Sequence, residues 1–123
     1  MLRKPIALTV LTALLVLGTG CTRKVSFKQD VFPILSNNCL SCHTAGGEGL
    51  AKSGLNMENY DGLMKGTKFG PIVVPGSAVS STLILLVEHQ GHPSINMPKD
   101  KTPISAEQIK IIRQWIDQGA KNN

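Results

Sequence analysis

Apolar residues repeat at helical spacing in several short stretches of this chain. The last stretch shows the repeat most clearly, with apolar residues every three or four positions at Ile109, Ile112, Trp115 and Ile116. This spacing predicts a helix with one buried face. Ser105 and Gln108 form a capping box in front of this helix, and Gly119 is placed to end it.

A second capping box, Ser26 with Gln29, predicts another helix that begins at about Phe27. Pro33 lies inside this helix. Because proline has no N–H to donate, we expect the helix to bend or tighten there and to end near residues 36–38.

Two shorter helices are expected in the middle of the chain. One covers residues 59–65 and ends at Gly66, and the other covers residues 81–89. The apolar face of the second comprises Leu83, Leu86 and Val87. The glycine-rich stretch 44–54 predicts a loop, and residues 69–76 are extended but too short and proline-flanked for a sheet. With no convincing strand, the pattern predicts an all-α domain.

Residues 1–20 have a different composition from the rest of the chain. Arg3 and Lys4 precede an uncharged apolar run, short for a bilayer span, that ends in small residues before Cys21. This arrangement is typical of an export signal, and an uncleaved membrane anchor is the alternative. We therefore predict a signal peptide at residues 1–20 and export of everything after it.

Cys21 lies where the predicted signal ends, and it is the odd one of three cysteines. An unpaired cysteine in an exported protein needs a reason. The stretch "LGTGC" resembles the lipoprotein box of bacteria, although Gly18 stands where that box prefers Leu, Val or Ile. The resemblance implies a lipid anchor at Cys21, with residues 21–26 forming the attachment site and a short tether.

The exported part is small, about a hundred residues, and it holds only one Trp, one Tyr and three Phe. So small a domain builds a thin core and usually depends on disulfides or a cofactor. The formal net charge is +5, with Lys and Arg scattered along the chain. Scattered charge is typical of a solvated surface, so we expect no nucleic-acid partner.

The most specific chemical signal is "CLSCH", which brings together Cys39, Cys42 and His43. Two thiols three positions apart on one turn reach the two vinyl groups along one edge of a haem. The imidazole that follows then lies under the iron. The motif therefore predicts one covalent haem c, with Cys39 and Cys42 as thioether anchors and His43 as the proximal ligand.

Two other uses of the motif are less favoured. Structural zinc needs four ligands, and His89 and His92 are the residues left to complete such a set in a compartment that favours disulfides. A thiol–disulfide enzyme is expected with a βαβ pattern, which the sequence lacks.

The sequence offers several candidates for the second axial ligand of the iron. Met97 lies in a proline-bounded loop far enough beyond His43 to reach the opposite face of a haem, and Pro98 stiffens that loop. Methionines at helical spacing are usually core residues, and Met57 and Met64 lie on or beside the predicted helix at 59–65. We favour Met97, and the alternatives are His89, His92 or an open site.

The motifs occur in an order that matches a known family. The segments "VFPILSNNCLSCH", "SGLNMENYDGLMKG", "GPIVVPGSAVSSTLI", "NMP" and "ISAEQIKIIRQWIDQGA" resemble small single-haem cytochrome c domains, especially the planctomycete-type subgroup. The resemblance covers residues 27–120. It departs from the pattern at Lys99, where the subgroup often has Pro, and at Thr44, where many cytochromes have Gly.

This resemblance implies a class I cytochrome c-like fold, with three to five short helices around one covalently bound haem. It also implies that the first and last helices pack together and that Met97 is the distal ligand. We therefore expect a monomeric electron carrier of the periplasm or cell envelope, anchored by lipid to a membrane. Its partners would be protein electron donors and acceptors.

With both axial positions filled, no substrate reaches the iron, so we expect no enzymatic activity. The alternative is a haem-based sensor or a peroxidase-like enzyme with a labile distal ligand.

Overall fold

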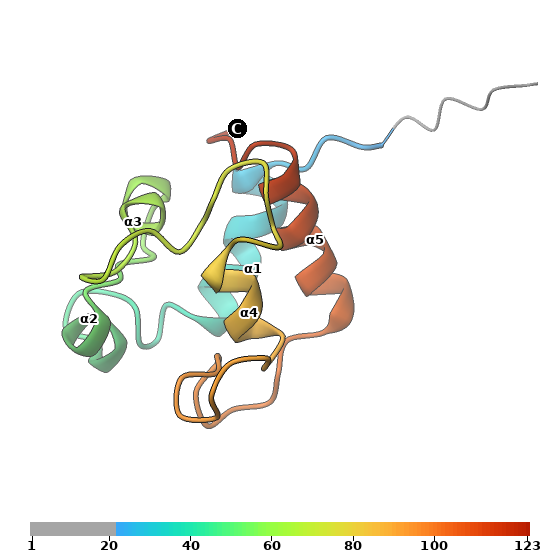
Figure 1. The fold of residues 1–123 in the computed structure, drawn as a ribbon. Coiled ribbons are helices and arrows are strands. Elements are labelled where there is room, and N and C mark those ends of the chain that lie inside the picture. Colours follow the sequence, from blue (N-terminus) through green and yellow to red (C-terminus); the bar gives the residue numbers. More distant parts are fainter. Residues whose placement is uncertain (1–21) are drawn as a thin grey trace, which may run out of the picture.

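The computed structural model describes residues 22–123, so the predicted signal peptide at residues 1–20 and the predicted lipidation of Cys21 lie outside the described residues. Within residues 22–123 the secondary structure is helical and contains no strand, which confirms the all-α prediction (Figure 1). An isolated β-bridge joins Thr67 and Gly70. In chain order the helices are the π-helical turn η1 (Phe27–Val31), α1 (Phe32–Asn38), α2 (Glu48–Ser53), α3 (Tyr60–Lys65), α4 (Thr82–Val87) and α5 (Ala106–Asp117).

The first helical segment begins as the capping pattern predicted, with a different partner for one bond. The Ser26 hydroxyl accepts a hydrogen bond from the Gln29 N–H at 3.2 Å. The Ser26 N–H, however, donates to the Asp30 carboxylate at 2.8 Å and not to the Gln29 side chain. This bond is the main reason why the pKa of Asp30 is lowered, and the Arg23 guanidinium at 2.9 Å adds to the effect.

Pro33 changes the helix by widening its first turn, whereas the sequence predicted bending or tightening. The Val31 N–H donates to the Ser26 carbonyl, and the Phe32 N–H donates to the Phe27 carbonyl, both five residues back. This wider turn accommodates the proline ring, which in a regular α-helix would clash with the carbonyl four residues earlier. Helix α1 then ends at Asn38, immediately before Cys39, as predicted.

The glycine-rich stretch 44–54 contains a helix, so the prediction of a loop there was wrong. Gly47 lies at the N-cap of α2, and Gly54 ends the helix in the left-handed conformation with φ of +76°. Two of the glycines therefore bound a helix instead of preventing one. The Lys52 ammonium also pairs with the Glu48 carboxylate one turn earlier.

The other helices lie close to their predicted positions. Helix α3 has Asn59 as its N-cap and Gly66 as its C-cap. Helix α5 has a complete capping box between Ser105 and Gln108. Helix α4 ends at Val87, two residues earlier than predicted. No helix in residues 22–123 is long and apolar enough to cross a bilayer.

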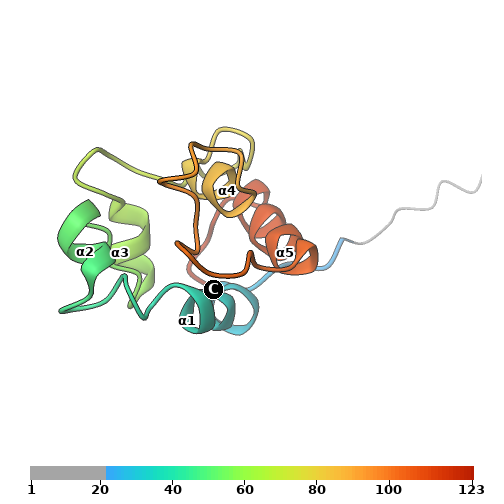
Figure 2. The same ribbon diagram turned by 90° about the horizontal axis from the view of Figure 1, so that it is seen from below.

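The two ends of the described chain pack together. Helix α5 lies beside η1 and α1 in both views, while α2 and α3 lie on the side of the molecule away from α5 (Figures 1 and 2). The Phe27 ring contacts the Tyr60 ring at 5.2 Å and the Trp115 ring at 5.4 Å between centroids. This aromatic cluster confirms the expected contact between the first and last helices.

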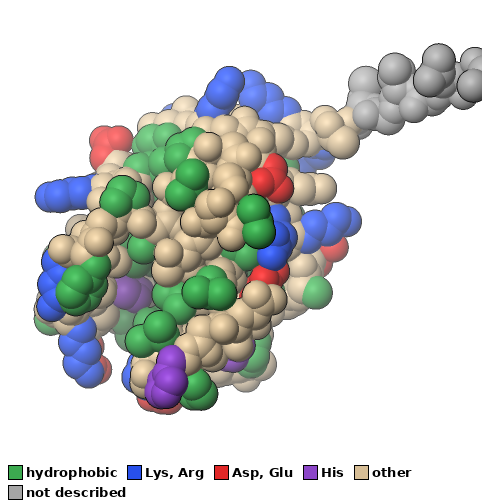
Figure 3. Space-filling view, viewed as in Figure 1, with side chains coloured by type: hydrophobic (Ala, Val, Ile, Leu, Met, Phe, Trp, Pro, Cys, Tyr) green, Lys and Arg blue, Asp and Glu red, His purple; other side chains and the backbone are tan. Residues whose placement is uncertain are grey.

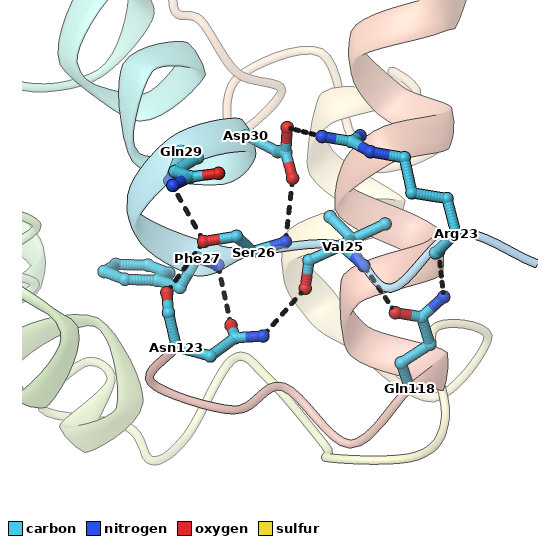
Figure 4. A network of polar contacts seen from close by, with 8 residues as sticks. All are labelled: Arg23, Val25, Ser26, Phe27, Gln29, Asp30, Gln118 and Asn123. Carbon is cyan, nitrogen blue, oxygen red and sulfur yellow. Dashed lines mark hydrogen bonds and ion pairs between the residues drawn. The ribbon is translucent and has the colours of Figure 1, made fainter.

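Hydrogen bonds from the C-terminal segment fix the position of residues 23–27, where the chain enters η1 (Figure 4). The Asn123 side chain accepts from the Phe27 N–H and donates to the Val25 carbonyl. The Gln118 side chain accepts from the Val25 N–H and donates to the Arg23 carbonyl. These bonds satisfy backbone groups that neither helix could satisfy alone.

Candidate haem-binding site

A cavity of about 600 Å³ opens between the end of α1, helix α2, helix α4 and the loop that follows α4. Its volume falls within the roughly 300–1,000 Å³ typical of ligand pockets. Much of its wall is apolar, including Leu55, Met57, Ile72, Leu83, Leu86 and Val87. The predicted apolar face of α4 therefore faces this cavity. A large, mostly apolar group suits a cavity of this volume and lining.

The residues that the sequence predicted to bind haem line this cavity. Cys39, Cys42, His43 and Met97 all line it. His89 and His92, the alternative distal ligands, are exposed and are not among the residues that line it. Met57 is buried and also lines the cavity, whereas Met64 packs against the core outside it.

His43 is held in a defined orientation. Its side chain is 7% exposed, and its Nδ1 lies 3.2 Å from the Leu55 carbonyl oxygen. Because a carbonyl oxygen only accepts hydrogen bonds, Nδ1 carries the proton and the lone pair of the neutral ring is on Nε2. Such a second bond is the usual means of orienting a histidine that binds a metal through its other nitrogen.

Gly49 gives the His43 ring its space. A Cβ at this position would lie 2.9 Å from Cε1 and 3.0 Å from Nδ1 of His43, closer than carbon atoms approach. A Cβ at Gly47 would lie 2.3 Å from the Cys42 carbonyl oxygen. The start of α2 therefore packs directly on the motif, which only glycine permits. These glycines follow "CLSCH" closely in the sequence, where their number predicted a loop and gave no sign of this packing.

Cys39 and Cys42 lie on the turn that leaves α1. The N–H groups of Cys42 and His43 both donate to the Cys39 carbonyl, at 3.1 and 3.0 Å. Neither thiol forms a disulfide within the described residues. Burial raises the pKa of the free Cys39 thiol to about 11, and the nearby Lys101 ammonium opposes this only in part. A thiol with so high a pKa is a poor nucleophile, which disfavours the thiol–disulfide alternative.

Met97 approaches the cavity from the loop after α4. Its N–H donates to the Leu86 carbonyl at 3.1 Å, and its own carbonyl accepts from the His89 ring at 3.0 Å. The next residue, Pro98, is buried. Both polar groups of the Met97 backbone are thus bound to the last turn of α4 and the residues just beyond it.

Basic and apolar side chains surround the mouth of the cavity. Lys101 donates to the Ser41 hydroxyl at 3.0 Å and so joins the loop after Met97 to the haem motif, a contact that the sequence did not indicate. Phe69 is 85% exposed at this rim. Figure 3 shows hydrophobic and basic side chains near one another over the part of the surface formed by α2, α3 and the loop after α4.

The described residues offer no zinc site. Within residues 22–123 no group of three or more His, Cys, Asp or Glu side chains is arranged to hold a metal ion. A structural zinc site would need four such ligands. The geometry therefore does not favour the zinc alternative.

A helical fold around an apolar cavity that holds a C-x-x-C-H motif is the arrangement of a c-type cytochrome. The family model described as planctomycete cytochrome C matches residues 39–101, which are 63 of the 123 residues, and the chain belongs to this family. Membership implies haem c as cofactor.

The chain is also similar to the hydrazine synthase subunit alpha of Kuenenia stuttgartiensis. The two are 25% identical over 126 residues, which cover 80% of this chain and 16% of that protein. The chain therefore spans only a small part of the length of this relative. No solved structure matches the chain.

Proposed function

We propose that this protein carries single electrons between redox proteins outside the cytoplasm. In this proposal one haem c is attached through Cys39 and Cys42, with His43 and Met97 as its axial ligands. The observation that carries the proposal is that all four side chains line one apolar cavity. Met97 is separated from His43 by more than fifty positions in the chain, so no local spacing accounts for this convergence.

The residues around the cavity suit electron transfer. Haem c, when bound, supplies a reversible one-electron change at its iron. The Leu55 carbonyl orients His43 and leaves its Nε2 available, and α4 gives the cavity an apolar wall. Leu86 and His89 hold the Met97 backbone, so little in the protein has to move when the haem iron would gain or lose an electron. A thioether ligand also favours the reduced state and raises the potential.

We place this carrier at a membrane because of the N-terminal segment before the cytochrome domain. An export signal at residues 1–20 and lipid on Cys21 would hold the domain at 27–120 on a membrane in the periplasm or cell envelope. There it would act as a monomer that exchanges electrons with protein donors and acceptors.

A second candidate is catalysis or sensing at a haem whose distal ligand leaves the iron. The observation that favours it is the similarity to a protein named as a subunit of hydrazine synthase. Catalysis or sensing requires a free axial position, whereas the carrier requires both positions to be filled.

Carbon monoxide binding to the reduced holoprotein at neutral pH separates the two. A carrier with Met97 on its iron should bind carbon monoxide slowly and weakly. Its ferric form should show the weak charge-transfer band near the red end of the spectrum that a thioether ligand produces. Rapid, tight binding of carbon monoxide by the parent protein would refute the carrier and favour the second candidate.

The ligand itself is tested by Met97→Ala, with Met57→Ala as the matched control from the same cavity wall. Met97→Ala should abolish the band, lower the potential and open the iron to carbon monoxide. Met57→Ala should keep the band and cost about 2–5 kcal/mol of stability, as expected for a buried methionine. If a histidine binds the iron instead, the parent should lack the band and Met97→Ala should change neither spectrum nor potential.

A further inference from the structure

Backbone and side-chain hydrogen bonds close the loop between α4 and Met97. The Leu86 carbonyl accepts the Met97 N–H at 3.1 Å. The Gly91 N–H donates to the Asn96 side chain at 3.1 Å, inside the same loop. The outermost bond runs from His89 Nε2 to the Met97 carbonyl at 3.0 Å. His89 is thus the residue whose side chain holds the backbone of the proposed ligand.

The backbone of His89 has an unusual conformation. Its φ is +56°, in the left-handed region that residues with side chains seldom adopt. Its ring is exposed, and burial of an apolar group therefore does not explain the conformation. A glycine would avoid the strain, but it would lose the ring that reaches Met97. The conformation also ends α4, because the Gln90 N–H donates to the Leu85 carbonyl, so the strain belongs to the helix end and the ring is what histidine adds there.

The residues around His89 give its ring a fixed base. The Arg113 guanidinium binds the Glu88 carboxylate at 2.7 Å and ties the end of α4 to α5. The His89 N–H donates to the Leu86 carbonyl at 3.1 Å, the same oxygen that accepts the Met97 N–H. The end of α4 is therefore attached to the longest helix on one side and to Met97 on the other.

We propose that His89 is a positioning residue for Met97: its ring holds the Met97 peptide group so that the thioether stays at the cavity. This proposal rests on the proposed function, in which Met97 binds the iron. Since the Met97 carbonyl can only accept, His89 Nε2 carries the proton and acts as donor. His89, first considered as an alternative ligand, thereby supports the ligand instead of replacing it.

The test uses three variants of the holoprotein. His89→Gly removes the donor and also relieves the backbone strain, so its thermal midpoint should equal or exceed that of the parent. Its carbon monoxide binding should nevertheless become about two- to tenfold faster, the factor expected for the loss of one net hydrogen bond. His89→Gln keeps an N–H donor of similar reach and should restore much of the parental rate. His92→Ala, which removes a nearby exposed ring bonded to Ser94, is the control and should leave the rate unchanged.

Amide hydrogen exchange at Met97 gives a readout that does not depend on a ligand for the iron. The exchange should be faster in His89→Gly than in the parent and the His92→Ala control. Parental exchange and a parental carbon monoxide rate in His89→Gly would overturn the role of His89. If Met97→Ala still abolished the thioether band in that case, the proposed function would stand. A parent protein without the band would overturn both proposals.

Discussion

Gly49→Ala tests the close packing between helix α2 and the proximal histidine. The added Cβ would lie 2.9 Å from His43 Cε1 and also 2.9 Å from the Cys42 carbonyl oxygen. Neither neighbour is the flexible end of a side chain. The ring is held by the Leu55 carbonyl, and the carbonyl of Cys42 accepts the Leu50 N–H at 2.9 Å. The methyl group therefore forces the ring or the start of α2 to move.

The expected size of the effect comes from two opposing contributions. Alanine is favoured over glycine inside a helix by about 1 kcal/mol. Overpacking a tight site costs about 1–3 kcal/mol. The net result should be a loss of up to about 2 kcal/mol, and each 1 kcal/mol lowers the thermal midpoint of a domain this small by about 4–8 °C. Because His43 moves relative to Leu55, the reduction potential should shift as well.

The assay combines thermal unfolding of the holoprotein, followed by circular dichroism, with a redox titration. Gly66→Ala after α3 is the control, because its Cβ would lie 2.5 Å from the Gly70 carbonyl oxygen, and its nearest neighbours are Gly70 and Pro71 and not His43. The control should lose stability and keep the parental potential. A Gly49→Ala protein that is more stable than the parent and has the parental potential would refute the reasoning.

The remaining predictions concern the cofactor, the anchor and one carboxylate. Acid–acetone extraction should leave the colour with the protein, because Cys39 and Cys42 hold the haem covalently; free haem in the extract would contradict this. A protein with both cysteines changed to alanine and shown to lack haem should be largely unfolded, since the apolar wall of the cavity is then open to water; a cooperative thermal transition would be evidence against it. Cys21→Ala should release the protein from membranes into the soluble fraction, and continued tight binding would indicate an uncleaved signal helix instead. The pKa of Asp30 is lowered in the folded state, so the charged carboxylate stabilises the fold. This stabilisation is fully present above the ordinary aspartate pKa. It is lost as the pH falls through the lowered pKa of the folded protein. Asp30→Asn should therefore be less stable than the parent at neutral pH and should approach it in acid; an equal difference at all pH values, measured by urea unfolding, would exclude the charge as the cause.

The sequence by itself determined the features that depend on neighbours within one helical turn. The Ser105 capping box and the glycine ends at Gly66 and Gly119 involve residues that are close in the chain, and the structure places helix ends at or next to them. The spacing of the haem motif is equally local, because the two thiols and the imidazole lie on one turn. The same signals were sufficient for the all-α class and for the family.

Local signals failed where a contact beyond one helical turn, or a second acceptor nearby, changed the outcome. Helix α2 was missed because its glycines have low helix propensity, yet contacts with Cys42 and His43 hold its first turn in place. At the start of η1 the Ser26 N–H donates to the Asp30 carboxylate and not to the Gln29 side chain, because the capping pattern does not distinguish two adjacent acceptors.

Only the tertiary structure decided which residues gather at the cavity. The sequence favoured Met97 for its proline-bounded loop, but it did not indicate that Met57 and the apolar face of α4 line the same cavity. No spacing of residues in the sequence predicts the contact of the Leu55 carbonyl with His43 or that of the His89 ring with Met97. A hydrogen bond between segments far apart in the chain exists only after packing has fixed both segments, so its partners are a property of the fold and not of the local sequence.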